Sequence, residues 1–367
     1  MKRFSVLMLA LFTCFALAAG QQAQANGKHK IIAFDAPGAG TGALQGTQGY
    51  YINPSGAITG SYIDSNGEYH GFLRDPHGKF TEFDPPDSQG TYSLSMNRAQ
   101  AIAGYYFDSN GVYHGFLRTA KGKFTSLDVS GAGSGPNQGT LAANINSKQE
   151  IAGYYIDSNG VGHGFVRAPD GTFTTFDDPH AGTGFGQGTY TASEGALNDA
   201  GAIAGGYADS NGAWHSFLRT ADGTITDFDA PAAGKGSGQG TQSSGINPSN
   251  AITGVYSDSK SVYHGFLRAA DGSITEFDVP GARKAAYEGT LGFNINPAGE
   301  IVGYFTDKAE AERGYVRAPD GAITKFDAPK AGKGGGAGTV PLSNNAAGKI
   351  TGYCIDPLDV LHGFLRE

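Results

Sequence analysis

One motif, H-G-F-x-R, recurs along this chain at nearly constant spacing, and it constrains the possible fold more than any other feature. Its first residue, or the Arg that replaces it once, stands at seven positions: His70, His114, His163, His215, His264, Arg313 and His362. The intervals between these positions are 44, 49, 52, 49, 49 and 49 residues. A fixed period of this length is typical of solenoids and β-propellers, in which each repeat is one supersecondary unit. The sequence therefore predicts seven repeat units within one domain.

Each unit contains four short apolar runs, named A to D here in chain order. In the third unit they are residues 139–146, 151–155, 163–167 and 173–177. Gly, Asn, Asp and Pro separate the runs, and no long segment has apolar residues at helical spacing, so an all-β fold is predicted. The A–B and C–D turns place Gly where a three-residue hairpin needs a left-handed residue.

The two ends of the repeat array are complementary. The array starts with a D-type run, Ile31 to Asp35, that has no A, B or C run before it. It finishes with a C-type run, His362 to Arg366, that has no D run after it. A ring can use this offset, because the first strand can complete the last unit. The sequence thus predicts a seven-bladed β-propeller of four-stranded antiparallel blades, closed by the N-terminal strand.

The repeated sequence resembles that of the bacterial extracellular repeat family named for its His-Ala-Phe motif. The resemblance lies in the H-G-F-L-R runs, with G-Y-x-x-D before them and F-D after them, and it covers nearly all of the chain after residue 29. Gly usually takes the place of Ala here, and Ser216 does so in the fourth unit. The resemblance implies export and a repeat architecture, and it supplies no catalytic or binding residues.

The first 25 residues have the features of a secretory signal peptide. Lys2 and Arg3 precede an apolar stretch at 4–19, and an A-x-A cleavage sequence follows at 23–25. The apolar stretch is too short for a membrane span. We therefore expect a signal peptide at 1–25, a short linker at 26–29 and the propeller at 30–367. The protein is expected to be exported, to the periplasm or outside the cell.

Composition narrows the classes of partner. The chain has 26 basic and 34 acidic residues, and removal of a leader holding Lys2 and Arg3 would change the formal net charge from −8 to −10. An acidic chain without a basic run is poorly suited to nucleic acid or to anionic membranes. Only Cys354 would remain after cleavage, and we expect it to be a buried side chain in a strand.

The recurring His residues are predicted to be structural. If the C–D turn is a three-residue loop, His70 lies opposite Asp84, and His163 and His264 lie opposite Asp177 and Asp278. A cross-strand His–Asp hydrogen bond is therefore expected in each unit. Imidazoles set one per blade lie too far apart to share a metal ion, so no metal site is predicted.

Two glycine-rich features have simple explanations. The D-S-N-G segments between the B and C runs lack the further acidic ligands of a calcium loop, so their Asp is expected to accept hydrogen bonds from its own turn. The D–A connections lack a G-K-[ST] sequence before a helix, so they are not phosphate-binding loops. No cofactor is predicted.

Candidate functional residues are those that the repeats do not share. The A-run of the fourth unit, 189–198, is three residues longer than the others and carries Glu194, and its C-run holds the only Trp. The candidate ligand-binding residues are Phe185, Tyr190, Glu194, Trp214, Arg283 and Tyr287. Aromatic rings beside polar groups suit sugars, which have apolar faces and hydroxyl groups. The alternative is drift among repeats, with Trp214 taking the place of Tyr69 or Tyr113.

The function favoured by the sequence is a secreted, nonenzymatic binding module for extracellular carbohydrate, acting through the face that carries the D–A and B–C loops. One alternative is a lyase or hydrolase acting on polysaccharide at this face, with Glu194 as its acid or base. Another is a purely structural surface protein. No Ser-His-Asp arrangement or G-x-S-x-G motif is present, so no catalytic residue is predicted for the favoured function. The ligand, oligomeric state and content of the central channel stay open.

Overall fold

The structure, a computed structural model, describes residues 29–192 and 195–367. These residues form 28 β-strands and no helix, as the all-β prediction requires. The expected signal peptide lies outside the described residues. Within them, no helix has the length and apolar character needed to cross a membrane.

The strands are short and evenly distributed along the chain. Their bounds are β1 (Ile31–Phe34), β2 (Gly46–Ile52), β3 (Ile58–Ile63), β4 (Tyr69–Arg74), β5 (Phe80–Phe83), β6 (Gly90–Met96), β7 (Ile102–Phe107), β8 (Tyr113–Arg118), β9 (Phe124–Leu127), β10 (Gly139–Ile145), β11 (Ile151–Ile156), β12 (Gly162–Arg167), β13 (Phe173–Phe176), β14 (Gly188–Thr191), β15 (Ile203–Ala208), β16 (Trp214–Arg219), β17 (Ile225–Phe228), β18 (Gly240–Ile246), β19 (Ile252–Ser257), β20 (Tyr263–Arg268), β21 (Ile274–Phe277), β22 (Thr290–Ile295), β23 (Ile301–Thr306), β24 (Glu312–Arg317), β25 (Ile323–Phe326), β26 (Gly338–Asn344), β27 (Ile350–Ile355) and β28 (Leu361–Arg366).

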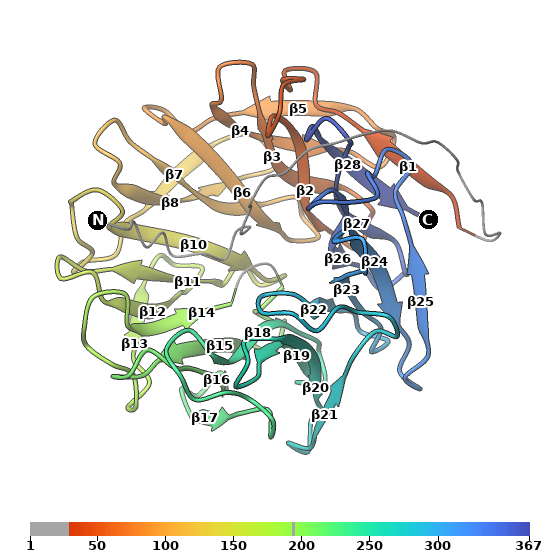
Figure 1. Cartoon of the computed structure of the whole chain (residues 1–367). Coiled ribbons are helices and arrows are strands. Elements are labelled where there is room, and N and C mark those ends of the chain that lie inside the picture. Colours follow the sequence, from red (N-terminus) through yellow and green to blue (C-terminus); the bar gives the residue numbers. More distant parts are fainter. Residues whose placement is uncertain (1–28, 193–194) are drawn as a thin grey trace.

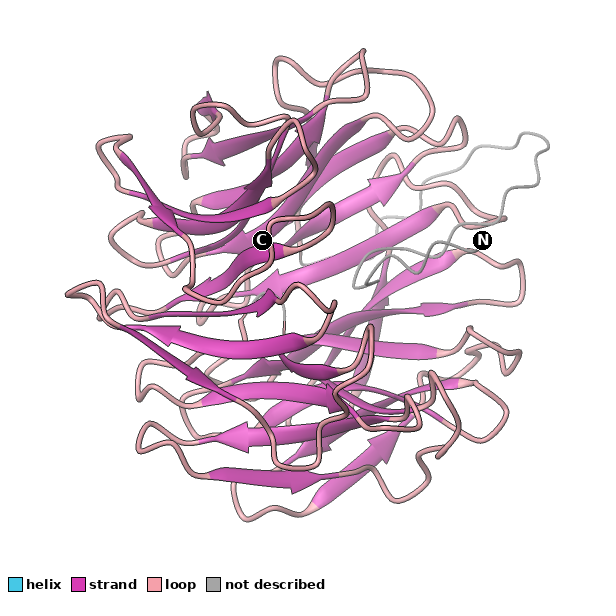
Figure 2. Ribbon diagram, turned by 90° about the vertical axis from the view of Figure 1, so that its left-hand side faces the viewer, coloured by secondary structure: helices cyan, strands magenta, loops and turns pink. Residues whose placement is uncertain are grey.

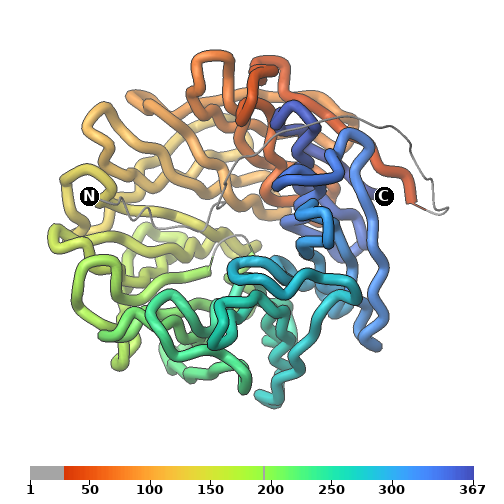
Figure 3. The backbone as a smooth tube through the Cα atoms, viewed as in Figure 1, coloured from red at the N-terminus to blue at the C-terminus, as the bar shows by residue number. Residues whose placement is uncertain are grey.

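Successive strands form antiparallel meanders that correspond to runs A to D of each unit. The first is β2-β3-β4-β5, in which Arg74 lies opposite Phe80, as the predicted hairpin register requires. The last combines β26, β27 and β28 with β1, whose Ile31 lies opposite Arg366. Figure 1 shows the meanders arranged around a common centre. The N-terminal strand therefore pairs with the end of the chain, next to it in Figure 3.

Neighbouring units touch through the start of each A strand. Gly139 of β10 pairs in parallel with Tyr113 of β8 in the preceding unit. Gly46 of β2 pairs in the same way with Leu361 of β28, which brings the first unit beside the last. These bridges join the meanders into one sheet of 12 strands and one of 16. Figure 2 shows that the loops gather at two opposite ends of the strands.

The turns have the predicted geometry. Gly56 in an A–B turn has φ 86°, and its NH donates to the carbonyl of Asn53 at 2.9 Å. Gly171 in a C–D turn has φ 99° and the same type of bond to Ala168. Glycine has no Cβ to clash in this left-handed region, so it is the residue of choice at both places.

The Arg and Phe of the repeat motif join adjacent units. Phe72 of the first unit is fully buried. Arg74 places its guanidinium 4.8 Å from the ring centre of Phe34, on the outer strand of the preceding unit. Arg118 lies 4.4 Å from Phe83 in the same way. Each such cation–π contact adds up to about 1 kcal/mol where it is exposed and more where it is buried, which explains why the motif recurs.

Apolar side chains fill one side of the centre. The A strands contain bulges, for example between Gly49 and Tyr51, and a bulge can redirect a side chain away from the sheet faces. The bulge residue Tyr50 is fully buried, in a cluster with Leu342 and, at its margin, Leu94 and Phe293. These four side chains come from units one, seven, two and six. The corresponding bulge residues of units three and five are the smaller Ala143 and Ser244.

The longer A-run of unit four approaches this same centre. Asn144 of unit three donates to the carbonyl of Ala192 at 3.0 Å and accepts from the NH of Ala196 at 2.8 Å. The NH of Ile246 in unit five donates to the carbonyl of Gly195 at 3.0 Å. A Cβ on Gly195 would lie 2.6 Å from Nδ2 of Asn294 in unit six. The described part of the extension therefore contacts inner strands of other units.

Cys354 lies in β27 and is fully buried, as expected from the sequence. Burial raises the pKa of its thiol to about 12. The thiol is therefore protonated at neutral pH and unreactive as a nucleophile.

Candidate functional site

Each recurring His binds an Asp of the outer strand that completes its own unit, which confirms the predicted pairing. The His Nδ1 atoms lie 2.7–3.0 Å from a carboxylate oxygen; the pairs are His70–Asp84, His114–Asp128, His163–Asp177, His215–Asp229, His264–Asp278 and His362–Asp35. Arg313 of unit six donates to Asp327 at 2.6 Å instead. These side chains tie strand C to strand D, so they are part of the scaffold.

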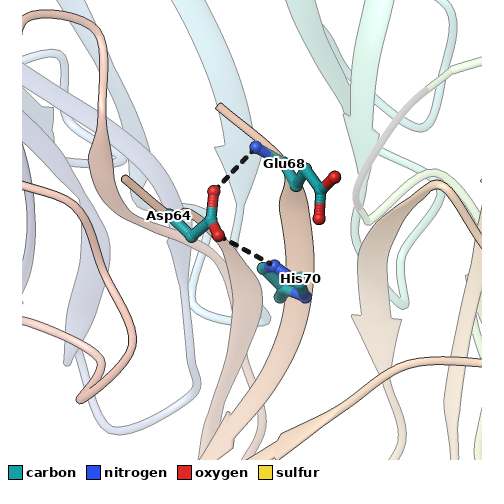
Figure 4. A group of neighbouring side chains, drawn as sticks. All are labelled: Asp64, Glu68 and His70. Atoms are coloured by element: carbon teal, nitrogen blue, oxygen red, sulfur yellow. Dashed lines mark hydrogen bonds and ion pairs between the residues drawn. The ribbon is translucent and has the colours of Figure 1, made fainter. Parts of the chain in front are cut away.

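The B–C turn supplies a second carboxylate to each of these groups. In unit one, Asp64 accepts hydrogen bonds from the backbone NH groups of Asn66 and Glu68, and its other oxygen lies 3.9 Å from Nε2 of His70 (Figure 4). The ring of Tyr62 stacks on the same imidazole at 4.9 Å between centres. The Asp of the D-S-N-G turn therefore holds its own turn, as predicted, and no calcium ion is needed to explain it.

The D–A loops rest on the B–C turns, so these two sets of loops share one face of the molecule. At six junctions a loop NH donates to a carbonyl of the preceding unit's turn: Leu44 to Asp359, Asn137 to Gly111, Gly186 to Gly160, Gly238 to Gly212, Tyr287 to Ser261 and Gly336 to Glu310. These hydrogen bonds hold each of these D–A loops against the B–C turn of the preceding unit. The loops of the predicted binding face are therefore hydrogen-bonded to one another and form a continuous surface.

This face carries every exposed large hydrophobic side chain found among the described residues. The exposed fractions are 48% for Leu44, 78% for Phe185, 61% for Tyr287 and 74% for Leu358. The first three lie in D–A loops and Leu358 lies in a B–C turn. Single exposed apolar residues are common on proteins, but their restriction to one face marks it as a candidate interaction surface.

Two of these residues adopt a backbone conformation that a side chain disfavours. Leu44 has φ 61° and Tyr287 has φ 64°. Gly186, Gly238 and Gly336 occupy the same place in three other loops, also with positive φ. A residue with a Cβ costs roughly 1–2 kcal/mol more than Gly in this region. Strain retained at an exposed apolar residue favours a functional role for it.

The aromatic residues predicted in unit four are only partly available to a ligand. Phe185 is exposed and lies over Gly160, where a Cβ would meet its ring at 2.4 Å. Tyr190 is buried, 7% exposed, because its ring fills the space beside Gly162 and its hydroxyl donates to the carbonyl of Gln187. Trp214 is half-buried, with its ring 5.5 Å from that of Tyr190. Tyr190 therefore does not present an exposed ring on which a ligand could stack.

The remaining predicted residues do not gather around Trp214. Arg283 forms ion pairs with Glu288 at 2.9 Å and with Glu310 of the neighbouring turn, so it holds its loop in place. Tyr287 stands in that same loop, between units five and six, and its ring is 6.3 Å from that of Tyr263. Glu194 lies outside the described residues. The structure thus distributes the predicted residues over two loop junctions.

The junction between units one and two was missed by sequence reasoning and contains a pocket of about 250 Å³. Its D–A loop, residues 84–89, is five residues shorter than the others, and among the described residues it makes no backbone hydrogen bond to the B–C turn of unit one. The pocket is lined by Glu68, Tyr69, His70, Asp84, Pro85, Asp87, Ser88, Gln89 and Gly90. The signal for it was present in the sequence: the His70–His114 interval is 44 residues instead of 49.

Glu312 is a further residue without a counterpart in other units. It begins β24 at the position of Trp214 in β16, and it lies beside Tyr304. One of its carboxyl oxygens is buried and has no hydrogen-bond partner within the described chain. Burial raises the pKa of Glu312 to about 8, so the group is largely protonated at neutral pH.

Comparisons with known proteins identify the fold. No protein-family model and no curated protein matches the chain, so the likeness to the His-Ala-Phe repeat family stays a resemblance. Among solved structures, a streptogramin B lyase superposes with a TM-score of 0.56 over 92% of this chain and 97% of its own, at 16% identity. The lectin BP39L from Burkholderia pseudomallei gives a TM-score of 0.55 over 88% and 95%, at 11% identity. Both are β-propeller-like proteins.

The fold is that of a β-propeller. The identities are too low to carry over an activity, so the similarity describes the fold alone. The loop-bearing face of this propeller holds its exposed apolar residues, and the pocket beside Tyr69 opens among the same set of loops.

Proposed function

We propose that the protein is an exported, nonenzymatic module that binds carbohydrate through the face formed by the D–A and B–C loops. The observation that carries this proposal is the restriction of Leu44, Phe185, Tyr287 and Leu358, all exposed, to that face. Sugar rings have apolar faces that stack on such side chains. An export signal at residues 1–25 would bring the module to extracellular polysaccharide.

The pocket between units one and two supplies the complementary polar groups. Glu68, Asp87 and Gln89 offer carboxylate and amide atoms, and Tyr69 offers an aromatic ring beside them. Sugar hydroxyls need donors and acceptors fixed in this way to define orientation. We propose this pocket as a subsite in addition to the surface around Phe185, where Trp214 lies half-buried.

The proposal includes a ring of seven blades closed by β1. Support comes from the pairing of β1 with β28, and from the parallel contact of Gly46 with Leu361. A closed ring holds the loops of different blades in fixed relation, so that a polysaccharide can contact several of them. BP39L is a lectin, and its similar fold is compatible with such a role.

A second candidate function is an enzyme acting on polysaccharide. Glu312 supports it, because a carboxyl group with a pKa of about 8 can serve as a proton donor near neutral pH. Glu194, the acid or base first suggested by the sequence, would be a separate candidate. A general acid also needs a partner base or nucleophile, whereas burial alone, without a neighbouring carboxylate, accounts for the raised pKa of Glu312. We therefore place binding ahead of catalysis.

A thermal-shift screen of the mature protein against soluble polysaccharides and oligosaccharides tests the proposal. A ligand that binds only the folded state raises Tm by mass action. We expect at least one sugar to raise Tm, and to do so less with Phe185→Ala. Reducing-end and unsaturated-product assays on the same sugar then distinguish binding from hydrolysis or lyase activity. No shift across the panel would contradict carbohydrate binding and favour a protein-binding or structural role.

A further inference from the structure

A buried position in each D–A loop has one unusual occupant. The residue that follows the Asp at the end of the D run lies in the core, and at six junctions its NH donates to the first Thr of the next A strand. These residues are Ala36, Val129, Asp178, Ala230, Val279 and Ala328, bonded to Thr47, Thr140, Thr189, Thr241, Thr290 and Thr339. Asp178 thus places a carboxylate where the other loops place a small apolar side chain.

The Asp178 carboxylate is buried and only half satisfied. The residue is 3% exposed, and its Oδ1 accepts from the NH of His180 at 2.9 Å. Its Oδ2 has no hydrogen-bond partner in the described chain. The carboxylate faces that of Asp227, on β17 of unit four, and two carboxylates cannot bond to each other unless one is protonated. Burial, and then Asp227, raise the pKa of Asp178 to about 6.

His180 completes the group. Its Nδ1 lies 2.8 Å from Oδ2 of Asp227 and 3.4 Å from Oδ1 of Asp178. One ligand atom from each of the three residues lies within 4.8 Å of the others. Zinc ligands stand about 2.1 Å from the metal, so atoms bound to one ion are roughly 3.0–3.5 Å apart. The distances from Nδ1 of His180 to the two carboxylates, 3.4 Å and 2.8 Å, are close to this spacing, and the 4.8 Å limit leaves only a small movement for all three atoms to bind one ion.

We propose that Asp178, His180 and Asp227 form a binding site for one divalent transition-metal ion, such as Zn²⁺ or Mn²⁺. Two carboxylates neutralise the charge of the ion, and imidazole with carboxylate is a donor set that these metals accept. The ion supplies the buried Oδ2 of Asp178 with a partner. It also fastens the loop that carries Phe185 to the outer strand of unit four.

The other carboxylate–imidazole groups do not share these features. Asp64, Glu68 and His70 are also close enough for a metal. However, both carboxylate oxygens of Asp64 already accept hydrogen bonds, from the backbone NH groups of Asn66 and Glu68 and from the side-chain amide of Asn66, whereas Oδ2 of Asp178 has no partner in the described chain. The competing explanation for the Asp178 group is a protonated His180 that bridges the two carboxylates without any metal. The experiment must distinguish these two possibilities.

Substitutions taken from the other units should preserve the fold. Asp178→Ala introduces the residue found at positions 230 and 328, and Asp227→Thr introduces the one found at 175. Glu276→Thr, at the place of Asp227 in unit five, is the matched control. Each mature protein is stripped with EDTA, dialysed against Zn²⁺ and analysed for bound metal. We expect wild type and the control to hold one more equivalent of zinc than the other two variants, with at least tenfold tighter binding.

Thermal unfolding separates metal binding from an ion-pair network. With Zn²⁺, Tm should rise for wild type and should not rise for Asp178→Ala or for His180→Ala, which changes a 68% exposed side chain. In EDTA, Asp178→Ala should have a higher Tm than wild type, because it removes a buried oxygen without a partner. Equal zinc in wild type and all variants, or a lower Tm of Asp178→Ala in EDTA, would overturn the proposal.

Discussion

The Nδ2 of Asn345 donates a hydrogen bond to the carbonyl of Asn53 at 3.1 Å, although 292 positions separate the two residues. The same bond joins Asn53 to Asn97 and Asn97 to Asn146, at 3.2 Å each. These residues end the A strands, and the Oδ1 of each also accepts from its own turn, as Asn345 does from Ala347 and Lys349 at 3.0 and 3.1 Å. One residue type thus shapes a turn and joins neighbouring units.

Asn345→Ala should destabilise the protein by about 2–4 kcal/mol, because it removes buried hydrogen bonds and leaves the carbonyl of Asn53 without its donor. Chemical denaturation measures the loss. Asn159→Ala is the control, since Asn159 lies exposed in a B–C turn and its side-chain amide donates to Asp157 of the same turn. We expect it to change stability by less than about 0.5 kcal/mol. Equal effects of the two substitutions would show that the link between the ends contributes little.

Arg313→His should be tolerated, because His occupies this position in the six other units and binds the same type of carboxylate. Arg313→Leu should cost about 1–3 kcal/mol, because Asp307 and Asp327 then lose their donor. Urea unfolding of the two variants compares them directly. A similar loss for both would contradict a structural role of the His–Asp pairs.

The stability of the wild-type protein should fall as pH rises from about 4.5 to 8, because of Glu312. Its pKa is raised to about 8 in the folded state, so the unfolded chain releases this proton first, and deprotonation favours unfolding. Glu312→Gln should remove the part of this pH dependence that comes from Glu312. The variant should be roughly 1–3 kcal/mol more stable than wild type at about pH 8.5, with little difference in stability near pH 4.

Denaturation across pH checks this expectation, with Glu68→Gln as a control at an exposed glutamate. If the free energies of unfolding of Glu312→Gln and wild type differ by the same amount at all pH values, the Glu312 carboxyl does not titrate as described.

Tyr287→Gly should leave the protein equally stable or up to about 1 kcal/mol more stable, because Gly relieves the left-handed φ of 64°. If Tyr287 contacts sugar, the same variant should bind the sugar more weakly. Such a trade between stability and function is common at binding sites. Calorimetric Tm and sugar affinity are measured on the same samples. A clear loss of stability would instead assign Tyr287 a role in packing.

Repeat spacing and hairpin register could be predicted because both are local. The His70–Asp84 bond follows from counting residues through one turn, and the Ile31–Arg366 pairing follows from the unpaired D and C runs at the two ends. The burial of Tyr190 could not be predicted, because it depends on Gly162 in the preceding unit.

The remaining features depend on contacts between units. Asp178 meets Asp227 only because a D–A loop folds over the outer strand of the next unit, 49 residues on. An alignment of the units would still have shown a carboxylate among Ala, Val and Pro at that position. The apolar cluster around Tyr50 depends on β-bulges in the A strands, and the turn sequences did not predict these bulges.

The most direct measurement of carbohydrate binding is isothermal titration of the best sugar from the thermal-shift screen into four mature proteins. These are wild type, Phe185→Ala, Tyr287→Gly and Lys121→Ala, the last in an exposed C–D turn on the opposite face. We predict that Phe185→Ala and Tyr287→Gly each weaken binding at least fivefold, corresponding to about 1 kcal/mol, while Lys121→Ala binds as wild type does. Equal affinity of all four proteins would contradict binding at the face of the D–A and B–C loops.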